Sequence, residues 1–201
     1  MLSFFSKLLF LIKKPQIVVV ENKEIAEAIF NLLSKYFKVG KFGEKWPGFF
    51  DILKNEILIL AVTNIDIEFL SKKSRRSILI INQINETVVK LIKTLRQDDY
   101  LILNFDDVEV RNSKKEAVSN ILTFGFYEGA DVQATDISQE NGIINFKLNY
   151  GGGFVPVWLN SVSETKLEES EIREEIYPKL VAVAVGIILG LNLVEISRGL
   201  K

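Results

Sequence analysis

Four short runs of aliphatic residues place the strongest constraint on the fold of this chain. They contain almost no polar residues, which is typical of strands that are buried on both faces of a parallel sheet. Segments with helical spacing of their apolar residues lie between them. Strands that alternate with helices predict a three-layer α/β domain, in which helices flank a mainly parallel sheet with right-handed crossovers. The four runs cover residues 17–20, 57–62, 77–81 and 101–104.

The apolar period changes to two after Asp131, which predicts strands of another kind. Alternating residues lead to Asn141-Gly142, a strong hairpin dipeptide, and the alternation resumes after it. We therefore predict a small antiparallel meander, inserted at about residues 120–160. The glycine triplet at 151–153 lies between two predicted strands with no helix after it, so we interpret it as a turn and not as a phosphate cradle.

The chain after the meander divides into a polar part and an apolar part. Residues 160–175 are rich in glutamate and are predicted to be a solvated linker that leads into a helix start. Residues 177–191 are apolar nearly all round, which predicts a buried core helix that ends at Gly190. A last short helix is predicted over residues 193–200.

The N-terminal residues 1–14 are apolar, with lysines at 7, 13 and 14, and their apolar run is too short to span a bilayer. We predict a helix that packs on the main domain, residues 15–201, or on a partner. The alternative is peripheral attachment to a membrane, with phenylalanine and leucine side chains in lipid and lysines near the headgroups.

Residues 41–55 combine glycines and a proline with aromatic residues, which predicts a loop with a hydrophobic floor. Trp46, Phe49 and Phe50 are expected to close the end of the core. The alternative is that these three aromatic residues line a site or contact a partner.

Composition excludes several function classes. The chain of 201 residues has no cysteine and no histidine, which excludes thiolate metal sites, thiol nucleophiles and histidine general bases. A formal net charge of −1 gives no basic excess for nucleic-acid binding. Any catalysis would depend on carboxylates, Lys, Tyr, Ser, Thr or a bound cofactor.

Motifs after residue 100 carry a family resemblance. The sequence reads LNFDD at 103–107, TFG at 123–125 and GADVQA at 129–134. With these motifs, roughly residues 15–200 resemble the central, ATP-binding domain of the Mur ligases, and most of all the type that adds D-alanyl-D-alanine to the peptidoglycan precursor. The resemblance implies a bacterial, cytoplasmic protein with a P-loop-NTPase-like sheet. It also implies ATP-dependent activation of a carboxylate as an acyl phosphate, which an amine then attacks.

The residues that the family uses for this chemistry are replaced. A P-loop should follow the first strand and hold the triphosphate with backbone N–H groups and a lysine, but the chain reads VENKEI at 20–25. By resemblance, Ala61 takes the place of a magnesium-binding glutamate and Val88 that of a carbamylated lysine. EIRE at 171–174 replaces a His-Asn pair.

By the same resemblance, Asn104 keeps the position that contacts adenine, with Asp106 and Asp107 beside it. These three residues are the predicted, weak nucleotide-binding set. The alternative for Asn104 is a strand-end residue that caps the next turn.

The sequence therefore predicts a non-catalytic Mur-ligase-like protein that acts as an interaction or structural module, with no catalytic or metal-binding residue and no cofactor. A protein partner or self-association is expected, in the cytoplasm, or at the inner face of the membrane if residues 1–14 touch lipid. One alternative is a divergent ATP-dependent amide ligase, or part of a split one, using ATP and magnesium. Another is a small-ligand module beyond the strand ends, near Asn64, Asn82 and Asn104.

Overall fold

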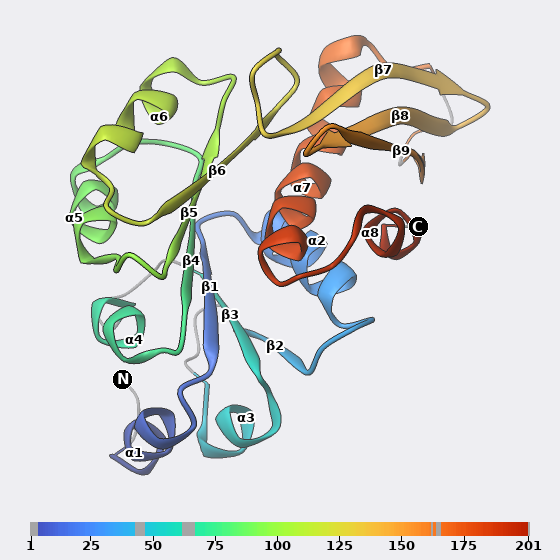
Figure 1. The fold of residues 1–201 in the computed structure, drawn as a ribbon. Coiled ribbons are helices and arrows are strands. Elements are labelled where there is room, and N and C mark those ends of the chain that lie inside the picture. Colours follow the sequence, from blue (N-terminus) through green and yellow to red (C-terminus); the bar gives the residue numbers. More distant parts are fainter. Residues whose placement is uncertain (1–3, 43–46, 62–66, 162, 164–165, 201) are drawn as a thin grey trace.

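The computed structural model describes residues 4–42, 47–61, 67–161, 163 and 166–200 (Figure 1). One sheet of nine strands organises them, in the order β2-β3-β1-β4-β5-β6-β7-β8-β9. The strands are β1 (Gln16–Val20), β2 (Val39–Phe42), β3 (Ile57–Ala61), β4 (Ser77–Ile81), β5 (Tyr100–Asn104), β6 (Asn120–Gly125), β7 (Val132–Glu140), β8 (Ile143–Tyr150) and β9 (Gly153–Asn160). The helices are α1 (Phe4–Lys13), α2 (Lys23–Leu33), α3 (Phe49–Lys54), α4 (Ile67–Lys73), α5 (Glu86–Thr94), α6 (Val108–Asn112), the 3-10 turn η1 (Ser113–Glu116), α7 (Glu169–Ile188) and α8 (Leu193–Gly199).

The aliphatic runs form the centre of the sheet, buried on both faces as predicted. In β1, Val18 and Val20 join one core cluster, whereas Ile17 and Val19 join another on the opposite face. Helices α2, α7 and α8 contribute to the first cluster, and α1, α3, α4, α5 and α6 contribute to the second. The three-layer α/β prediction is therefore confirmed. None of the helices in the described ranges combines the length and apolar character that crossing a bilayer requires.

Strand pairing corrects the start of the antiparallel part. β6 pairs in parallel with β5, and the first residues of β7 pair in parallel with the end of β6. Antiparallel pairing is seen from β7 to β8 and from β8 to β9. The meander thus begins at Val132 and not near residue 120, because the short connection after β6 moves the chain sideways by one strand without reversing it.

Two segments contain more regular structure than their composition predicts. Residues 41–55, predicted as a loop, contain the end of β2 and all of α3, in which Ile52 is fully buried. Phe49 and Phe50 are 40% and 69% exposed, so the prediction that they close the end of the core is wrong for these two. Trp46 lies outside the described residues.

The acidic segment before residue 176 is also partly helical, since α7 begins at Glu169. The carboxylate of Glu171 accepts the backbone N–H of Glu168 at 2.8 Å, which closes a capping box at the helix start. Arg173 pairs with Glu169 at 2.6 Å and lies 5.1 Å from the ring centre of Phe126. These contacts stabilise the polar first turn of α7, which the spacing of apolar residues does not predict.

Candidate functional site

The carboxyl edge of the parallel sheet is where ligands bind in folds of this type, so it is the candidate site. Its first part is the passage from β1 to α2. Only Glu21 and Asn22 separate the strand from the helix. The Asn22 side chain accepts the N–H groups of Glu24 and Ile25, at 2.6 and 3.3 Å. Two donors of the first helical turn are thus bonded to the protein's own side chain, and burial raises the pKa of the neighbouring Glu21 carboxyl.

The predicted nucleotide-binding residues lie at the carboxyl end of β5. Oδ1 of Asn104 accepts the N–H of Asp106 at 3.0 Å, which is the turn-capping contact of the alternative interpretation. Oδ1 of Asp107 accepts the N–H groups of Glu109 and Val110, at 2.8 and 3.0 Å, and so caps α6.

Asp106 connects the ends of β5 and β6. Its carboxylate accepts the N–H of Phe126 at 2.8 Å and the N–H of Tyr127 at 3.0 Å. The close approach depends on Gly125, because a Cβ there would lie 2.5 Å from Oδ1 of Asp106. Each of the three predicted residues therefore has a structural role, while their contact with a nucleotide stays a prediction.

Tyr177 of α7 also lies at the carboxyl edge of the sheet, although the sequence analysis did not predict it as a site residue. Its hydroxyl donates to Oδ1 of Asn82 at 3.2 Å and also interacts with the Asn104 side chain, so it joins the ends of β4 and β5. Its ring meets Phe124 edge-on, with 5.1 Å between centroids. Burial raises the pKa of the Tyr177 phenol, and the negative charges of Asp106 and Asp107 raise it further. No local sequence signal marks this residue, which lies where the charged first half of α7 gives way to its apolar second half.

Ala61 and Val88, which the sequence resemblance places at the family's metal positions, have side chains without ligand atoms. Ala61 ends β3, and Val88 of α5 is buried among aliphatic residues. Within the described ranges, no three or more Asp or Glu residues are grouped so that they could hold a metal ion. Asn64, which was predicted beside Asn82 and Asn104 in a small-ligand site, falls outside the described residues.

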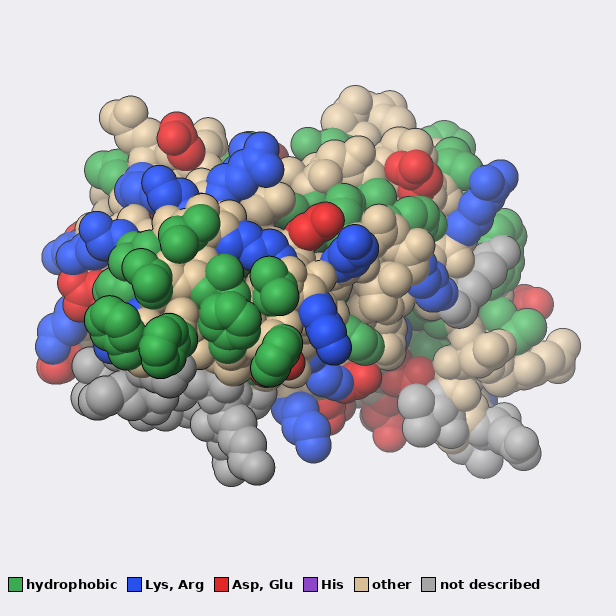
Figure 2. All heavy atoms as spheres, turned by 90° about the horizontal axis from the view of Figure 1, so that it is seen from below, with side chains coloured by type: hydrophobic (Ala, Val, Ile, Leu, Met, Phe, Trp, Pro, Cys, Tyr) green, Lys and Arg blue, Asp and Glu red, His purple; other side chains and the backbone are tan. Residues whose placement is uncertain are grey.

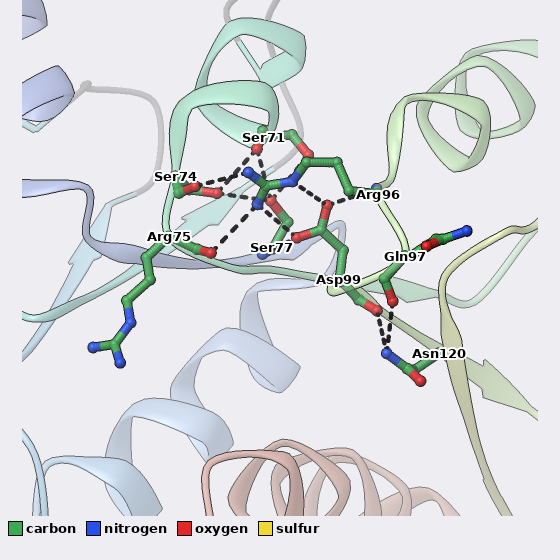
Figure 3. Close-up of polar contacts among 8 residues, drawn as sticks. All are labelled: Ser71, Ser74, Arg75, Ser77, Arg96, Gln97, Asp99 and Asn120. Carbon is green, nitrogen blue, oxygen red and sulfur yellow. Dashed lines mark hydrogen bonds and ion pairs between the residues drawn. The ribbon is translucent and has the colours of Figure 1, made fainter.

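A separate polar cluster lies at the opposite, amino edge of the sheet (Figure 3). Asp99, which precedes β5, is fully buried and accepts the N–H of Ser77 at 2.7 Å. Arg96 donates to both carboxylate oxygens, from Nη2 at 2.9 Å and from Nε at 3.1 Å, and Nη1 reaches the carbonyl of Ser74 at 3.1 Å. Hydrogen bonding to Asp99 raises the pKa of Arg96. This ion pair, in which only Asp99 is fully buried, joins the starts of β4 and β5, and we interpret it as structural.

Residues 61–164 match the family model described as the Mur ligase middle domain. The chain belongs to this family. The resemblance found in the sequence is thereby confirmed, and solved Mur ligases share the fold. The MurF ligase of Thermotoga maritima, solved with ADP, aligns with a TM-score of 0.70 at 19% identity, over 96% of this chain and 50% of that one. A MurF structure from Acinetobacter baumannii aligns at 0.69 with 17% identity, over 96% and 48%.

Among curated proteins, the UDP-N-acetylmuramate–L-alanine ligase of Clostridium novyi (strain NT) is 39% identical over 62 residues, which is 31% of this chain and 13% of that protein. This Mur ligase-like chain spans about half the length of the solved relatives. The comparisons therefore show its family and its fold, and the activity of the longer ligases enters only as a proposal.

Proposed function

We propose that this protein is a non-catalytic member of the Mur ligase family that acts as an interaction module. The observation that carries the proposal is the Asn22 cap at the start of α2. In the family this is the place of the P-loop, where backbone N–H groups must be free to bind phosphate. Here a ligand phosphate would have to displace the cap, at a cost of about 1 kcal/mol.

Charge at the same place also supports the proposal. Glu21 and Glu24 flank the cap, and their carboxylates would repel a triphosphate. Lys23 is exposed between them, without a cradle of glycine backbone around it. At the metal positions, Ala61 and Val88 cannot coordinate magnesium. The described residues thus do not fit ATP with magnesium, although the resemblance puts the side chain of Asn104 at the adenine position.

The alternative, a divergent or split ATP-dependent ligase, rests on the polar strand end formed by Asn104, Asp106 and Tyr177. Both functions can be tested by one calorimetric titration of ATP with magnesium into the full chain and into Asn104→Ala. We expect no saturable heat from either protein under conditions in which a Mur ligase with an intact P-loop binds. Magnesium-dependent binding with a micromolar Kd that Asn104→Ala abolishes would overturn the proposal in favour of the ligase.

A further inference from the structure

Helices α1 and α3 together present a continuous exposed apolar surface, which we call the α1–α3 face. Figure 2 shows hydrophobic side chains gathered at this end of the molecule, which is the lower end in Figure 1. Four phenylalanines take part, and Phe4, Phe5 and Phe50 are 76%, 69% and 69% exposed. The α1–α3 face consists of Phe4, Phe5, Leu8, Leu11 and Ile12 of α1 with Phe49, Phe50 and Leu53 of α3.

This face is built on anchored helices. Phe10 of α1 is fully buried, with its ring centre 6.5 Å from that of Phe69 in α4. The Lys13 ammonium donates to the carbonyls of Ile52, Leu53 and Asn55, at 2.7, 2.5 and 2.7 Å. Carbonyls at a helix C-terminus lack intrahelical partners, so Lys13 ties α1 to the end of α3. The exposed side chains are therefore held as one surface.

The border of the α1–α3 face is basic, although the whole chain carries a net charge of −1. Figure 2 shows Lys and Arg side chains to the left, above and to the right of the apolar area, with some acidic side chains among them. Segments 4–15 and 48–56 contain four lysines against two acidic residues. One of those acids, Asp51, accepts the N–H of Gly48 at 2.8 Å. The other lysines of these segments are Lys7, Lys14 and Lys54, and the Lys7 ammonium lies 5.6 Å from the ring centre of Phe69 in α4.

The combination of an apolar centre and a basic border indicates which partner the α1–α3 face binds. In a symmetric contact between two copies, the α1–α3 face of one copy would pack against the same face of the other. The lysines at the two borders would then lie close together and repel one another. An anionic bilayer matches both features, because apolar side chains enter the acyl boundary while lysines meet the phosphate headgroups. We propose that the α1–α3 face docks this protein on an anionic lipid bilayer. This docking proposal rests on the proposed function as an interaction module, for which it gives the class of partner. Its test is independent of the outcome of the ATP titration.

The position of the face in the fold sets the orientation on the membrane. Helices α1 and α3 lead into the amino ends of β1 and β3, at the bottom of the sheet in Figure 1. The carboxyl edge with Asn104 and Tyr177 is at the other end of the strands. A docked molecule would thus turn its candidate site away from the lipid.

Co-sedimentation of the full chain with vesicles tests the proposal. We expect binding to vesicles of equimolar phosphatidylcholine and phosphatidylglycerol, and much weaker binding to phosphatidylcholine alone. The double variant Phe5→Ser/Phe50→Ser should lower the partition coefficient by about tenfold or more, since both side chains lose their burial in lipid. Lys14→Gln/Lys54→Gln should lower it roughly fivefold per lysine, and added salt should weaken binding of the wild type.

Phe154→Ser is the matched control, because Phe154 of β9 is 62% exposed but lies far from the face in the fold, and it should bind like the wild type. Thermal unfolding of each variant checks that the fold is intact. The proposal would be overturned if the wild-type protein does not co-sediment with anionic vesicles, or if Phe5→Ser/Phe50→Ser binds them as tightly as the wild type does. A dimer in light scattering that the same double variant dissociates, without vesicle binding, would instead identify a second copy as the occupant.

Discussion

Oδ1 of Asn22 lies 2.6 Å from the backbone nitrogen of Glu24 and accepts its N–H. This contact makes the start of α2 an ordinary capped helix, at the place where the resemblance puts the family's phosphate loop. The carbonyl of Asn22 also accepts the N–H of Ala26 at 3.0 Å, so the residue is integrated into the helix by both its side chain and its backbone.

Removal of this cap should destabilise the protein. We expect Asn22→Ala to lower the free energy of unfolding by about 1 kcal/mol, because the N–H groups of Glu24 and Ile25 lose their acceptor. Urea denaturation measures the change. Asn31→Ala, at an exposed position within the same helix, should be neutral or slightly stabilising, since alanine has the higher helix propensity. Equal effects of the two substitutions would contradict the role given to Asn22.

The Arg96–Asp99 ion pair at the amino edge should contribute more to the stability than the Asn22 cap. We expect Asp99→Ala to cost about 2–4 kcal/mol, because it leaves the Ser77 N–H without an acceptor and Arg96 without its partner. The cost stays below that of breaking a fully buried pair because the Arg96 side chain is 39% exposed and can regain water. Asp98→Ala, at the exposed neighbouring position, should stay within about 0.5 kcal/mol of the wild type. Chemical denaturation of both variants checks the difference.

Tyr177 should make the stability depend on alkaline pH. Its pKa in the folded protein is raised above the ordinary value of 10.0, so the fold favours the neutral phenol. The associated stability is fully present below the ordinary value and is lost as the pH rises through the raised one. Tyr177→Phe keeps the ring against Phe124 but has no proton to lose, so its stability should fall less over the same range. Denaturant titrations at neutral and alkaline pH compare the two proteins, and parallel pH profiles would argue against a buried phenol at this edge.

Gly125 should be intolerant of a side chain. In Gly125→Ala the new Cβ would lie 2.5 Å from Oδ1 and 2.8 Å from Cγ of Asp106, so the carboxylate must move away from the Phe126 and Tyr127 N–H groups. We expect a loss of about 1–3 kcal/mol, the range for buried hydrogen-bond partners that lose their acceptor. Gly153→Ala meets only ordinary contacts of 3.7 and 3.9 Å and should be nearly neutral. Thermal or urea unfolding of the two variants provides the comparison.

Much of the fold follows from local patterns. Residues such as Val18 and Val19 alternate between two buried faces, so a continuous aliphatic run is enough to predict a central parallel strand. The hairpin at Asn141-Gly142 forms because both residues adopt positive φ, 50° and 73°, which this dipeptide tolerates. The acidic start of α7 was predicted as a linker that leads into a helix, although its capping box and its Glu169–Arg173 ion pair are local. The contact of Arg173 with Phe126 is the part that only tertiary packing supplies.

At the candidate site, the sequence by itself determined which residue types are present and which are replaced: Asn104 at the end of a strand, and Ala61 and Val88 without ligand atoms. Only the tertiary structure decided what those residues contact. Tyr177 meets Asn82 across 95 positions of sequence, and Asp106 meets Phe126 across 20. Likewise, apolar composition marked α1 and residues 49–50, but solvent exposure depends on which face of a helix finds a neighbour, and that is a property of packing.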